Sequence, residues 1–376
     1  MNVYISKVQN GNTYKAVEIC FNEIATDNFL KDVRKVLIKP NFVNASPADT
    51  GVTTDPRIIK ALIKILKEKG IEEVIVGESS LSNTKEVFKS LNLYELEKFG
   101  AKVVNFDDDE WIRVDSPLQL ALKKFRVAKK VFDCDLFISV AKMKTHSDTH
   151  VTLSIKNVLG TIPKIDRKAC HIIDINKAIV DVFAYIIKNK KFLSFIDGIY
   201  ALEGKLGPTT GKPVKMDLVI ASSDAVAADA TCVEIMDYDI NKVEHILLSN
   251  KFGFGKIEDR EIIGEKIENI KRKFEMPVFL PKQKLPILSL IMEKTFKRKP
   301  YLKNREKCIG CKCCLEACPK DAIFMKNGII KIRYKNCISC LVCCEACIEG
   351  ALDYELSNLL LYKFGEKLMK IYRKLF

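Results

Sequence analysis

The sequence predicts an α/β protein whose large domain has a mostly parallel sheet with helices on both faces. A small α+β domain and a C-terminal helix are expected to follow. In the first 270 residues, short runs of β-branched residues alternate with helical patterns, as in parallel sheets whose strands are joined by helices. Two closely similar cysteine runs come next, and they indicate a second, smaller domain built around sulfur ligands.

Composition divides the chain into four expected segments. The large domain spans residues 1–270. Residues 271–300 form a linker, because prolines recur there among many Lys and Arg residues. The cysteine-rich domain spans residues 301–352. Residues 353–376 place leucines and lysines at helical spacing, which predicts an amphipathic helix that either packs on the protein or lies on a membrane surface.

Local signals mark the strands and helices of the large domain. An apolar run at 36–38 ends before Pro40. Asp55 and Pro56 then supply an N-cap and a favourable first residue for a helix that we expect to end at Gly70. Further strands are expected at 74–76, 103–104, 136–138, 192–196 and 218–220, with helices at 172–188 and 225–236.

The composition excludes a disordered chain, since 48% of the residues are hydrophobic. The first residues contain no apolar leader. No apolar run approaches the length of a membrane span, about 20 residues. Fourteen cysteines without a leader are typical of a reducing compartment, so we expect a cytoplasmic protein.

The net charge of +14 is concentrated in the C-terminal third of the chain. Such a basic region fits contact with an acidic redox partner protein or an anionic membrane surface, and it equally fits a solvated linker. The basic connector within it lacks the interleaved aromatic residues of a surface that stacks single-stranded nucleic acid. Nucleic acid is therefore not an expected partner.

The two cysteine runs share a spacing of three, three and four positions. The first run is Cys308, Cys311, Cys314 and Cys318, and the second is Cys337, Cys340, Cys343 and Cys347. This spacing is that of bacterial two-cluster ferredoxins, in which the fourth cysteine of each run ligates the other cluster. We therefore expect one [4Fe–4S] cluster on Cys308, Cys311, Cys314 and Cys347, and a second on Cys337, Cys340, Cys343 and Cys318.

Zinc sites and disulfides are the alternatives for these cysteines. Zinc sites usually join two Cys-x2-Cys pairs across a longer loop, and neither alternative explains two copies of a four-cysteine run. Cys313 and Cys344 are additional thiols beside the expected ligands. Whether either of them replaces a neighbour as ligand stays open.

Polar side chains of the large domain fall where predicted strands end. Lys39 and Asn41 follow the first strand, Ser79 follows the second, and Asp197 follows the strand at 192–196. Ligands of open α/β sheets bind outside the carboxyl ends of the strands, so we expect these residues to line one crevice. Its cations and hydroxyl groups suit a carboxylate or a phosphate.

The richest strand end follows residues 136–140. It contains Lys142, Lys144, Thr145 and His146, with His150, Lys156, Asn157 and His171 nearby. A histidine among lysines suits proton transfer to or from an anion, so we expect Lys142, Lys144 and His146 to take part in any catalysis. His146 and His150 would share one face of a helix, as metal ligands can, but no acidic residue completes a zinc-protease motif.

The usual nucleotide-binding motifs are absent from the sequence. The chain has neither G-x-G-x-x-G nor G-x-x-x-x-G-K-[ST], which argues against a standard dinucleotide fold or a P-loop. The loop after Gly77 is rich in serine and threonine, so a bound flavin stays an open alternative. A further metal ion bound by Asp197 and Glu203 also stays open. Neither cofactor has other support in the sequence.

Several segments resemble the DUF362 family, a family of unknown function often fused to a two-cluster ferredoxin module. They are LIKPNFV (37–43), GVTTDP (51–56), IVGESS (75–80), SVAKMKTHSDTHVTLSIKNVLG (139–160), IDGIYALEGKLGPTTGKP (196–213) and ASSDAVAADA (221–230). The resemblance covers roughly residues 1–265 and implies an iron–sulfur-associated α/β domain. Ile348 departs from the pattern, because a proline often follows the last cluster cysteine.

The sequence leaves two functions open, and so does not decide whether this is an enzyme. In the first, an oxidoreductase transfers single electrons between the clusters and a small anionic substrate or cofactor. Its anion-binding residues would be Lys39, Asn41, Ser79, Thr145, Lys156, Asn157, Asp197 and Glu203, most of which recur in the family that the chain resembles. In the second, a non-catalytic electron-transfer or docking subunit serves a partner redox protein. A bound small molecule distinguishes the two.

Overall fold

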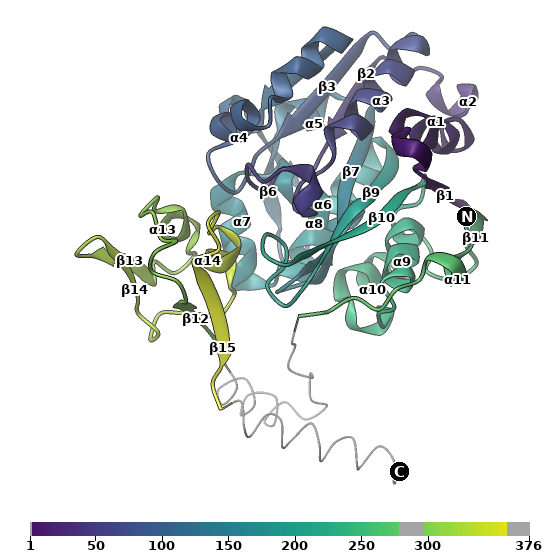
Figure 1. Ribbon diagram of the computed structural model, residues 1–376. Helices are drawn as coiled ribbons and strands as arrows, with labels where there is room; N and C mark the ends of the chain where they lie inside the picture. Colours follow the sequence, from purple (N-terminus) through teal and green to yellow (C-terminus); the bar gives the residue numbers. More distant parts are fainter. Residues whose placement is uncertain (1, 278–296, 359–376) are drawn as a thin grey trace. The chain divides into compact units, whose positions relative to one another are not determined.

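The computed structural model describes residues 2–277 and 297–358 (Figure 1). The chain divides into two compact units, Met1–Pro277 and Val278–Phe376, and the division falls within the segment expected to be a linker. Most of that linker, and residues 359–376 of the expected C-terminal helix, lie outside the described residues. Each unit is described by itself below.

The first unit is built on one central sheet. Its strands, in spatial order, are β11 (Glu261–Gly264), β1 (Asn2–Lys7), β10 (Lys212–Ser222), β9 (Lys191–Glu203), β7 (Leu136–His146), β2 (Lys35–Lys39), β3 (Glu73–Glu78) and β4 (Ala101–Asn105), and β8 (His150–Thr152) pairs with β7. The β7–β9, β2–β7, β2–β3, β3–β4 and β1–β11 pairs are parallel, whereas β10 runs antiparallel to β1 and β9. The predicted α/β class with a mostly parallel sheet is confirmed.

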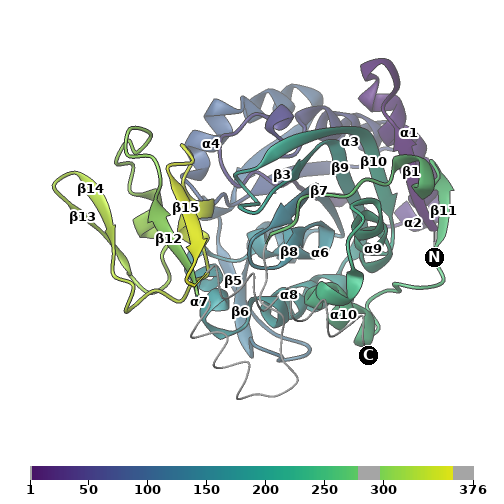
Figure 2. The same ribbon diagram turned by 60° about the horizontal axis from the view of Figure 1, so that its bottom comes forward.

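Helices cover both faces of this sheet (Figures 1 and 2). The helices are α1 (Thr13–Ile24), α2 (Asp27–Leu30), α3 (Pro56–Glu68), α4 (Thr84–Ser90), α5 (Lys129–Asp133), α6 (Ser154–Asn157), α7 (Lys164–Ile173), α8 (Ile175–Asn189), α9 (Ala225–Ile235), α10 (Glu244–Lys251) and α11 (Ile267–Ile270). Short 3₁₀ segments occur at Gln9–Gly11, Ala48–Thr50, Leu93–Phe99, Phe106–Asp108, Val158–Thr161 and Ile240–Lys242. A separate hairpin joins β5 (Trp111–Asp115) to β6 (Lys124–Ala128).

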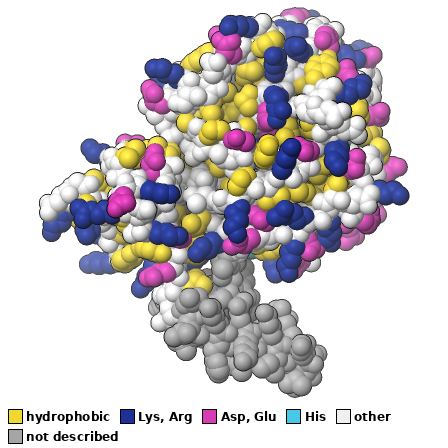
Figure 3. Space-filling model, viewed as in Figure 1, with side chains coloured by type: hydrophobic (Ala, Val, Ile, Leu, Met, Phe, Trp, Pro, Cys, Tyr) yellow, Lys and Arg dark blue, Asp and Glu magenta, His cyan; other side chains and the backbone are white. Residues whose placement is uncertain are grey.

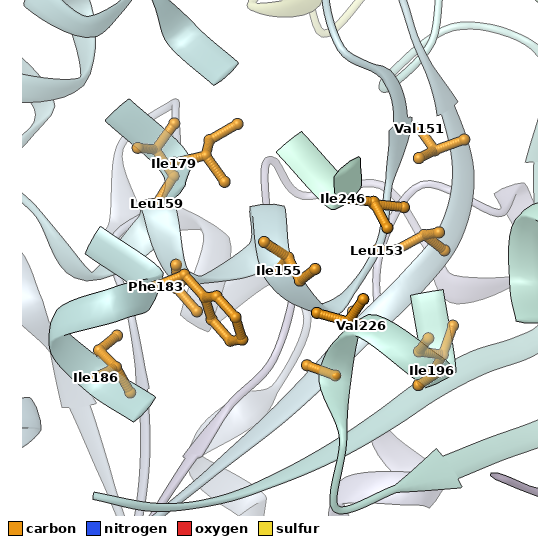
Figure 4. Close-up of a cluster of buried hydrophobic side chains, with 14 of the residues drawn as sticks. Val151, Leu153, Ile155, Leu159, Ile179, Phe183, Ile186, Ile196, Val226 and Ile246 are labelled. Atoms are coloured by element: carbon orange, nitrogen blue, oxygen red, sulfur yellow. The ribbon is translucent and has the colours of Figure 1, made fainter. Parts of the chain in front are cut away.

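Two apolar cores lie on the two faces of the sheet, because alternate residues of a strand point to opposite sides. Val36 and Ile38 belong to the core beneath α1 and α3, whereas Leu37 between them belongs to the core beneath α6, α8, α9 and α10. Figure 4 shows the second core, where Ile155 and Phe183 lie among side chains from the neighbouring helices and from β9.

The helix predicted after Asp55 forms for the expected reasons. The Asp55 side chain accepts a hydrogen bond from Arg57 N (2.9 Å), and Pro56 occupies the first turn. The apolar side chains buried by α3 include Ile58, Ile59, Leu62, Ile63 and Leu66. Gly70 follows the helix end with φ +80°, a conformation that glycine adopts at low cost.

Two of our expectations about strand ends are wrong. Residues 142–146 do not follow β7 but form its last part, and Asp197 lies inside β9. The strands continue because β8 pairs with the end of β7 and β10 pairs with the end of β9. In addition, the helix expected at 172–188 is two helices, since Asp174 ends α7 and caps α8.

The second unit contains two short antiparallel pairs and two short helices. β12 (Arg298–Leu302) pairs with β15 (Leu352–Leu356), and β13 (Ile323–Lys326) pairs with β14 (Ile329–Ile332). The helices are α13 (Cys313–Ala317) and α14 (Val342–Glu345). β12 begins inside the expected linker, and residues 353–356, expected at the start of a helix, form β15. Pairing of these residues with β12 has replaced the expected helix there.

Basic and acidic side chains are interspersed over the face shown in Figure 3. Among the described residues, no helix is long and apolar enough to cross a membrane.

Candidate functional site

The first set of cysteines gathers around Cys314. Burial raises the pKa of the Cys314 thiol to about 12, and the nearby Cys343, Cys347, Cys311 and Cys308 add to the rise. Three of these four neighbours are its predicted partners on one cluster. The structure therefore brings Cys347, from the second run, to the first set of ligands, as crossed ligation requires.

The second set of cysteines lines one cavity. Its lining includes Cys318, Cys337, Cys340 and Cys343 together with apolar side chains such as Ile323. Four soft sulfur donors around an apolar space are the donor set that an iron–sulfur cluster needs. The residues present therefore fit a cluster at this position.

Backbone amides support the charge of several of these sulfurs. The N–H groups of Ala322, Ser339 and Ala351 donate to the Sγ atoms of Cys318, Cys337 and Cys347 over 3.2, 3.4 and 3.2 Å. Hydrogen bonds to a charged acceptor stabilise the charge, and hydrogen bonds to the sulfurs also tune the reduction potential of a cluster.

The two cysteine runs repeat in backbone conformation as well as in sequence. Gly310 and Ser339 occupy corresponding positions and have φ of +68° and +61°. Lys312 and Leu341 also correspond, with φ of +64° and +62°, and each precedes a short helix. Non-glycine residues rarely adopt this conformation, so its recurrence shows that both runs form the same turn.

The two additional thiols point to backbone carbonyls. Cys313 Sγ donates to Cys311 O over 3.8 Å, and Cys344 Sγ donates to Asp353 O over 3.7 Å. Each thiol thus has a backbone carbonyl as a partner, although Cys313 also lies beside Cys311 and Cys344 beside Cys343. Among the described residues, no three His, Cys, Asp or Glu side chains are arranged to share a single metal ion.

In the α/β unit, Lys39 at the end of β2 is neutralised by Glu78 at the end of β3. Lys39 Nζ lies 2.7 Å from Glu78 Oε2, and both side chains are buried. Burial lowers the pKa of Lys39, and Glu78 opposes that shift. Gly160 packs directly over the pair, since a Cβ there would lie 2.8 Å from Lys39 Nζ and from Glu78 Oε1.

Lys142 is neutralised in the same way by Asp197, which faces it across the β7–β9 pair. Lys142 Nζ lies 2.8 Å from Asp197 Oδ2, and both side chains are fully buried. Asp197 also accepts hydrogen bonds from Asp55 N and Ile199 N. Its charge is therefore satisfied by three donors.

The segment between β2 and α3 covers the lysines of β7. Lys142 Nζ donates to Ala48 O over 3.4 Å, and Lys144 Nζ donates to Val52 O over 2.6 Å. Thr145 instead contacts the glycine-rich loop after β9, where its hydroxyl donates to Gly204 O over 2.9 Å. A Cβ at Gly207 would meet Thr145 O at 2.1 Å, so only glycine fits there.

Asn41, Ser79 and Asn157 lie near Lys39 in a second polar group. Asn41 Nδ2 donates to Asn157 Oδ1 over 3.1 Å, and Asn157 Nδ2 donates to Lys39 O over 2.9 Å. Ser79 donates to Asp107 over 2.6 Å and accepts from Arg167 over 2.6 Å. Sequence reasoning missed Glu78, Asp107 and Arg167 as members of this group.

Glu203, the last residue of β9, has hydrogen bonds to both of its carboxylate oxygens. Its two carboxylate oxygens accept from Arg272 Nη2 and Glu275 N, both at 3.0 Å. These bonds join β9 to the segment after α11. The contacts of these residues thus place Lys142 with Asp197, Lys39 with Asn41 and Asn157, and Glu203 with Arg272, rather than all of them in one crevice.

His146 lies in a cluster that contains all four histidines of the chain. His146 faces His150 across the β7–β8 pair. Burial lowers the pKa of His146 well below its usual value, and nearby Lys156, His171, Lys144 and His245 lower it further. His146 Nδ1 accepts from the N–H groups of Asp148 (3.0 Å) and Thr149 (3.3 Å), so the proton of the neutral ring lies on Nε2.

Lys156 reaches this cluster from α6, which is anchored by Asp229 of α9. Asp229 accepts from Ser154 N (2.8 Å) and Ile155 N (2.9 Å) at the start of α6. Burial raises the pKa of Asp229 to about 8. His245 of α10 was missed by sequence reasoning, because it lies far along the chain and no local motif marks it.

Comparisons with known proteins match a segment in each of the two units. The family described as a domain of unknown function (DUF362) matches residues 36–234, and a 4Fe-4S binding domain matches residues 301–324. A thylakoid-associated protein of Synechocystis is 25% identical over 231 residues, which cover 60% of this chain and 70% of that protein.

Two solved structures show weak similarity. One is a structural-genomics protein from Thermotoga maritima, with a TM-score of 0.38, 15% identity and 58% coverage of each chain. The other is the lactate racemase apoprotein from Thermoanaerobacterium thermosaccharolyticum, with a TM-score of 0.38, 14% identity and coverage of 62% of this chain and 57% of that one. The chain thus spans less than two thirds of either structure. The family match, which covers more than half of the chain, shows that this iron–sulfur protein belongs to the DUF362 family.

Proposed function

We propose that this protein transfers single electrons through two [4Fe–4S] clusters and couples them to a small anion bound by the α/β unit. Cys308, Cys311, Cys314 and Cys347 would hold one cluster, and Cys318, Cys337, Cys340 and Cys343 the other. Each bound cluster would accept and release one electron at a time. An external protein would supply or remove these electrons.

The observation that best supports a second cluster is the cavity lined by Cys318, Cys337, Cys340 and Cys343. The 4Fe-4S family match covers the first cysteine run alone. The second run has the same spacing and repeats the same left-handed turns. Because the two runs share their cysteine spacing and their backbone conformation, we expect the second run to bind a cluster as the first run does.

The proposed anion site centres on His146, Lys144 and Lys156. Lys39 and Lys142 are neutralised by Glu78 and Asp197, so their charges contribute little to binding an anion. Lys156 and Lys144 both act electrostatically on His146. In the proposed site, the neutral His146 would donate its Nε2 hydrogen to the bound anion.

A non-catalytic electron-transfer or docking subunit is the alternative proposal. Its partner would be a redox protein, and the basic C-terminal third would contact that partner or an anionic membrane surface. Lys144, Lys156, His171 and His245 all act electrostatically on His146, and such a cluster is more than docking requires, which favours the small-molecule site.

Native mass spectrometry of anaerobically purified protein tests the proposal. We expect the mass of the chain plus two [4Fe–4S] clusters, with additional mass from a bound small molecule. That additional mass should disappear in the Lys144→Ala/His146→Ala variant and persist in Lys168→Ala, which changes a neighbouring surface residue of α7. Two clusters without additional mass in any sample would favour the docking subunit.

A further inference from the structure

The turn between the first two cysteines is more open in the first run than in the second. Cys311 is exposed, whereas Cys340 at the corresponding position is half-buried. Lys312 is exposed, whereas the corresponding Leu341 is buried. Because the two turns have the same backbone conformation, the difference lies in what covers them. A protein that approaches the second unit therefore reaches the first set of expected ligands more readily than the second set.

The open turn presents an apolar side chain beside an expected ligand. Ile309 is 64% exposed, and it directly follows Cys308, so their Cα atoms lie about 3.8 Å apart. Little covers the next residue either. Among the described residues, apart from its chain neighbours, a Cβ at Gly310 would have only Met325 Cε within 4 Å, at 3.9 Å. An apolar contact at this turn would place a partner next to the first set of cysteines.

Two lysines flank the same turn. Lys307 directly precedes the first cysteine of the run, and Lys312 directly follows the second. Both are exposed, and in the part of the chain that the structure describes neither forms an ion pair. Asn336 and Leu341 stand at the corresponding positions of the second run. This pair of positive charges is thus specific to the first turn, and it suits a partner with an acidic surface.

We propose that Lys307, Ile309, Cys311 and Lys312 form a face, here called the first-turn face, that docks a small acidic electron-carrier protein. Ile309 would be the apolar centre of the contact, and the two lysines would meet carboxylates of the carrier at its rim. The redox group of the carrier would then lie beside the cluster that Cys311 is expected to hold. This inference rests on the proposed function and names the class of protein that exchanges electrons with this chain.

Flavodoxin is a suitable probe, because it is a small acidic electron carrier that contains flavin and adds no iron to the sample. Isothermal titration calorimetry with the anaerobic full-length protein, clusters included, measures its binding. We expect binding that weakens at least about tenfold between about 20 and 200 mM salt, because salt screens the charges. Cytochrome c, a basic electron carrier, should not bind. Absence of flavodoxin binding at low salt, or equal binding of cytochrome c, would overturn the proposal.

Charge variants locate the contact on the chain. Lys307→Gln/Lys312→Gln should weaken flavodoxin binding at least about fivefold at low salt. Lys297→Gln/Lys335→Gln is the matched control, because it removes the same charge from exposed residues near Cys337 of the second run. The control should change the affinity less than about twofold. Equal weakening in the two double variants would mean that net charge alone attracts flavodoxin, which would remove the first-turn face.

Ile309→Ser tests the apolar centre of the face. It should weaken flavodoxin binding at least about fivefold, since a buried isoleucine side chain contributes about 1.5–3 kcal/mol. Ile338→Ser, at the corresponding position of the second run, should leave the affinity within about twofold of the wild type. A similar loss in both variants would show that the carrier does not distinguish the two turns, contrary to the proposal.

Iron analysis of every sample separates failure of this inference from failure of the proposed function. Full iron content without flavodoxin binding leaves the clusters in place and overturns the first-turn face. Protein that holds zinc in place of iron refutes the proposed function itself. Binding of phosphatidylserine vesicles that is lost in Lys307→Gln/Lys312→Gln, without any binding of flavodoxin, would overturn the proposal by assigning the face to a membrane surface.

Discussion

Lys142 Nζ lies 2.8 Å from Asp197 Oδ2, with both side chains fully buried between adjacent strands β7 and β9. Taking two charges out of water costs much of what their attraction gains. Asp197 recovers part of that cost through hydrogen bonds from Asp55 N and Ile199 N. The pair therefore ties the segment before α3 to the centre of the sheet.

Removal of Lys142 should strongly destabilise the α/β unit. Lys142→Met leaves Asp197 as an uncompensated buried charge, which costs about 3–5 kcal/mol. Urea unfolding followed by the fluorescence of Trp111, the single tryptophan of the chain, measures the loss. Lys15→Met is the control, because Lys15 pairs with Glu18 at the surface, where such pairs contribute less than about 1 kcal/mol. Equal losses in the two variants would contradict the account.

The pairing of Lys142 with Asp197 shows where sequence reasoning stops. Apolar runs and the Asp55–Pro56 cap predict the strands and α3, because those signals are local. The partner of Lys142 depends on which residues of β9 face β7, and that register comes from the whole sheet. For this reason the sequence identified both residues but treated them as lining an open crevice.

The histidine cluster shows the same limit on a larger scale. The stretch from His146 to Lys156 stands out in the sequence because cations and histidines are neighbours there. His245 reaches the cluster only because α10 packs beside α6 and α8 on one face of the sheet. The cysteine runs, in contrast, are local signals, and their ligation is predicted from spacing alone.

Stability should fall as the pH drops below about 6.5, the usual pKa of histidine. The pKa of His245 is lowered to about 3 in the folded protein, and that of His146 is also lowered. Below about pH 6.5 the unfolded chain therefore binds protons at these histidines that the folded protein does not bind. Each of these histidines then lowers the free energy of unfolding by about 1.4 kcal/mol per pH unit. Urea unfolding at several pH values between about 6.5 and 5 measures this slope.

His245→Phe should reduce that slope by about one histidine's share. Lys15→Met should leave the slope unchanged, because Lys15 is an exposed residue of α1. A slope that is the same in the wild type and in His245→Phe would mean that His245 is not buried in its neutral form.

Arg167 should be a stabilising residue of the polar group at the end of β3. Its guanidinium donates to Ser79 O (2.7 Å) and Ser79 Oγ (2.6 Å). Arg167→Met removes both bonds and should cost about 1.5–3 kcal/mol in unfolding free energy. Lys168→Met, on the next residue of α7, should cost less than about 0.5 kcal/mol. Comparable losses would show that Arg167 contributes no specific contact.

The additional thiols should be dispensable for cluster binding. Cys313 and Cys344 hydrogen-bond to backbone carbonyls, so Cys313→Ser and Cys344→Ser should keep the iron content of the wild type. The visible absorption of anaerobically purified protein, together with iron analysis, measures this. A loss of iron in either variant would make that thiol a ligand.

The most direct test of two clusters is the iron and acid-labile sulfide content of wild-type protein and of Cys340→Ser, both prepared anaerobically. Two [4Fe–4S] clusters give about eight iron atoms per chain, and loss of the second cluster should leave about four. About four iron atoms in both proteins, or zinc in place of iron, would contradict the assignment of Cys318, Cys337, Cys340 and Cys343 to a second cluster.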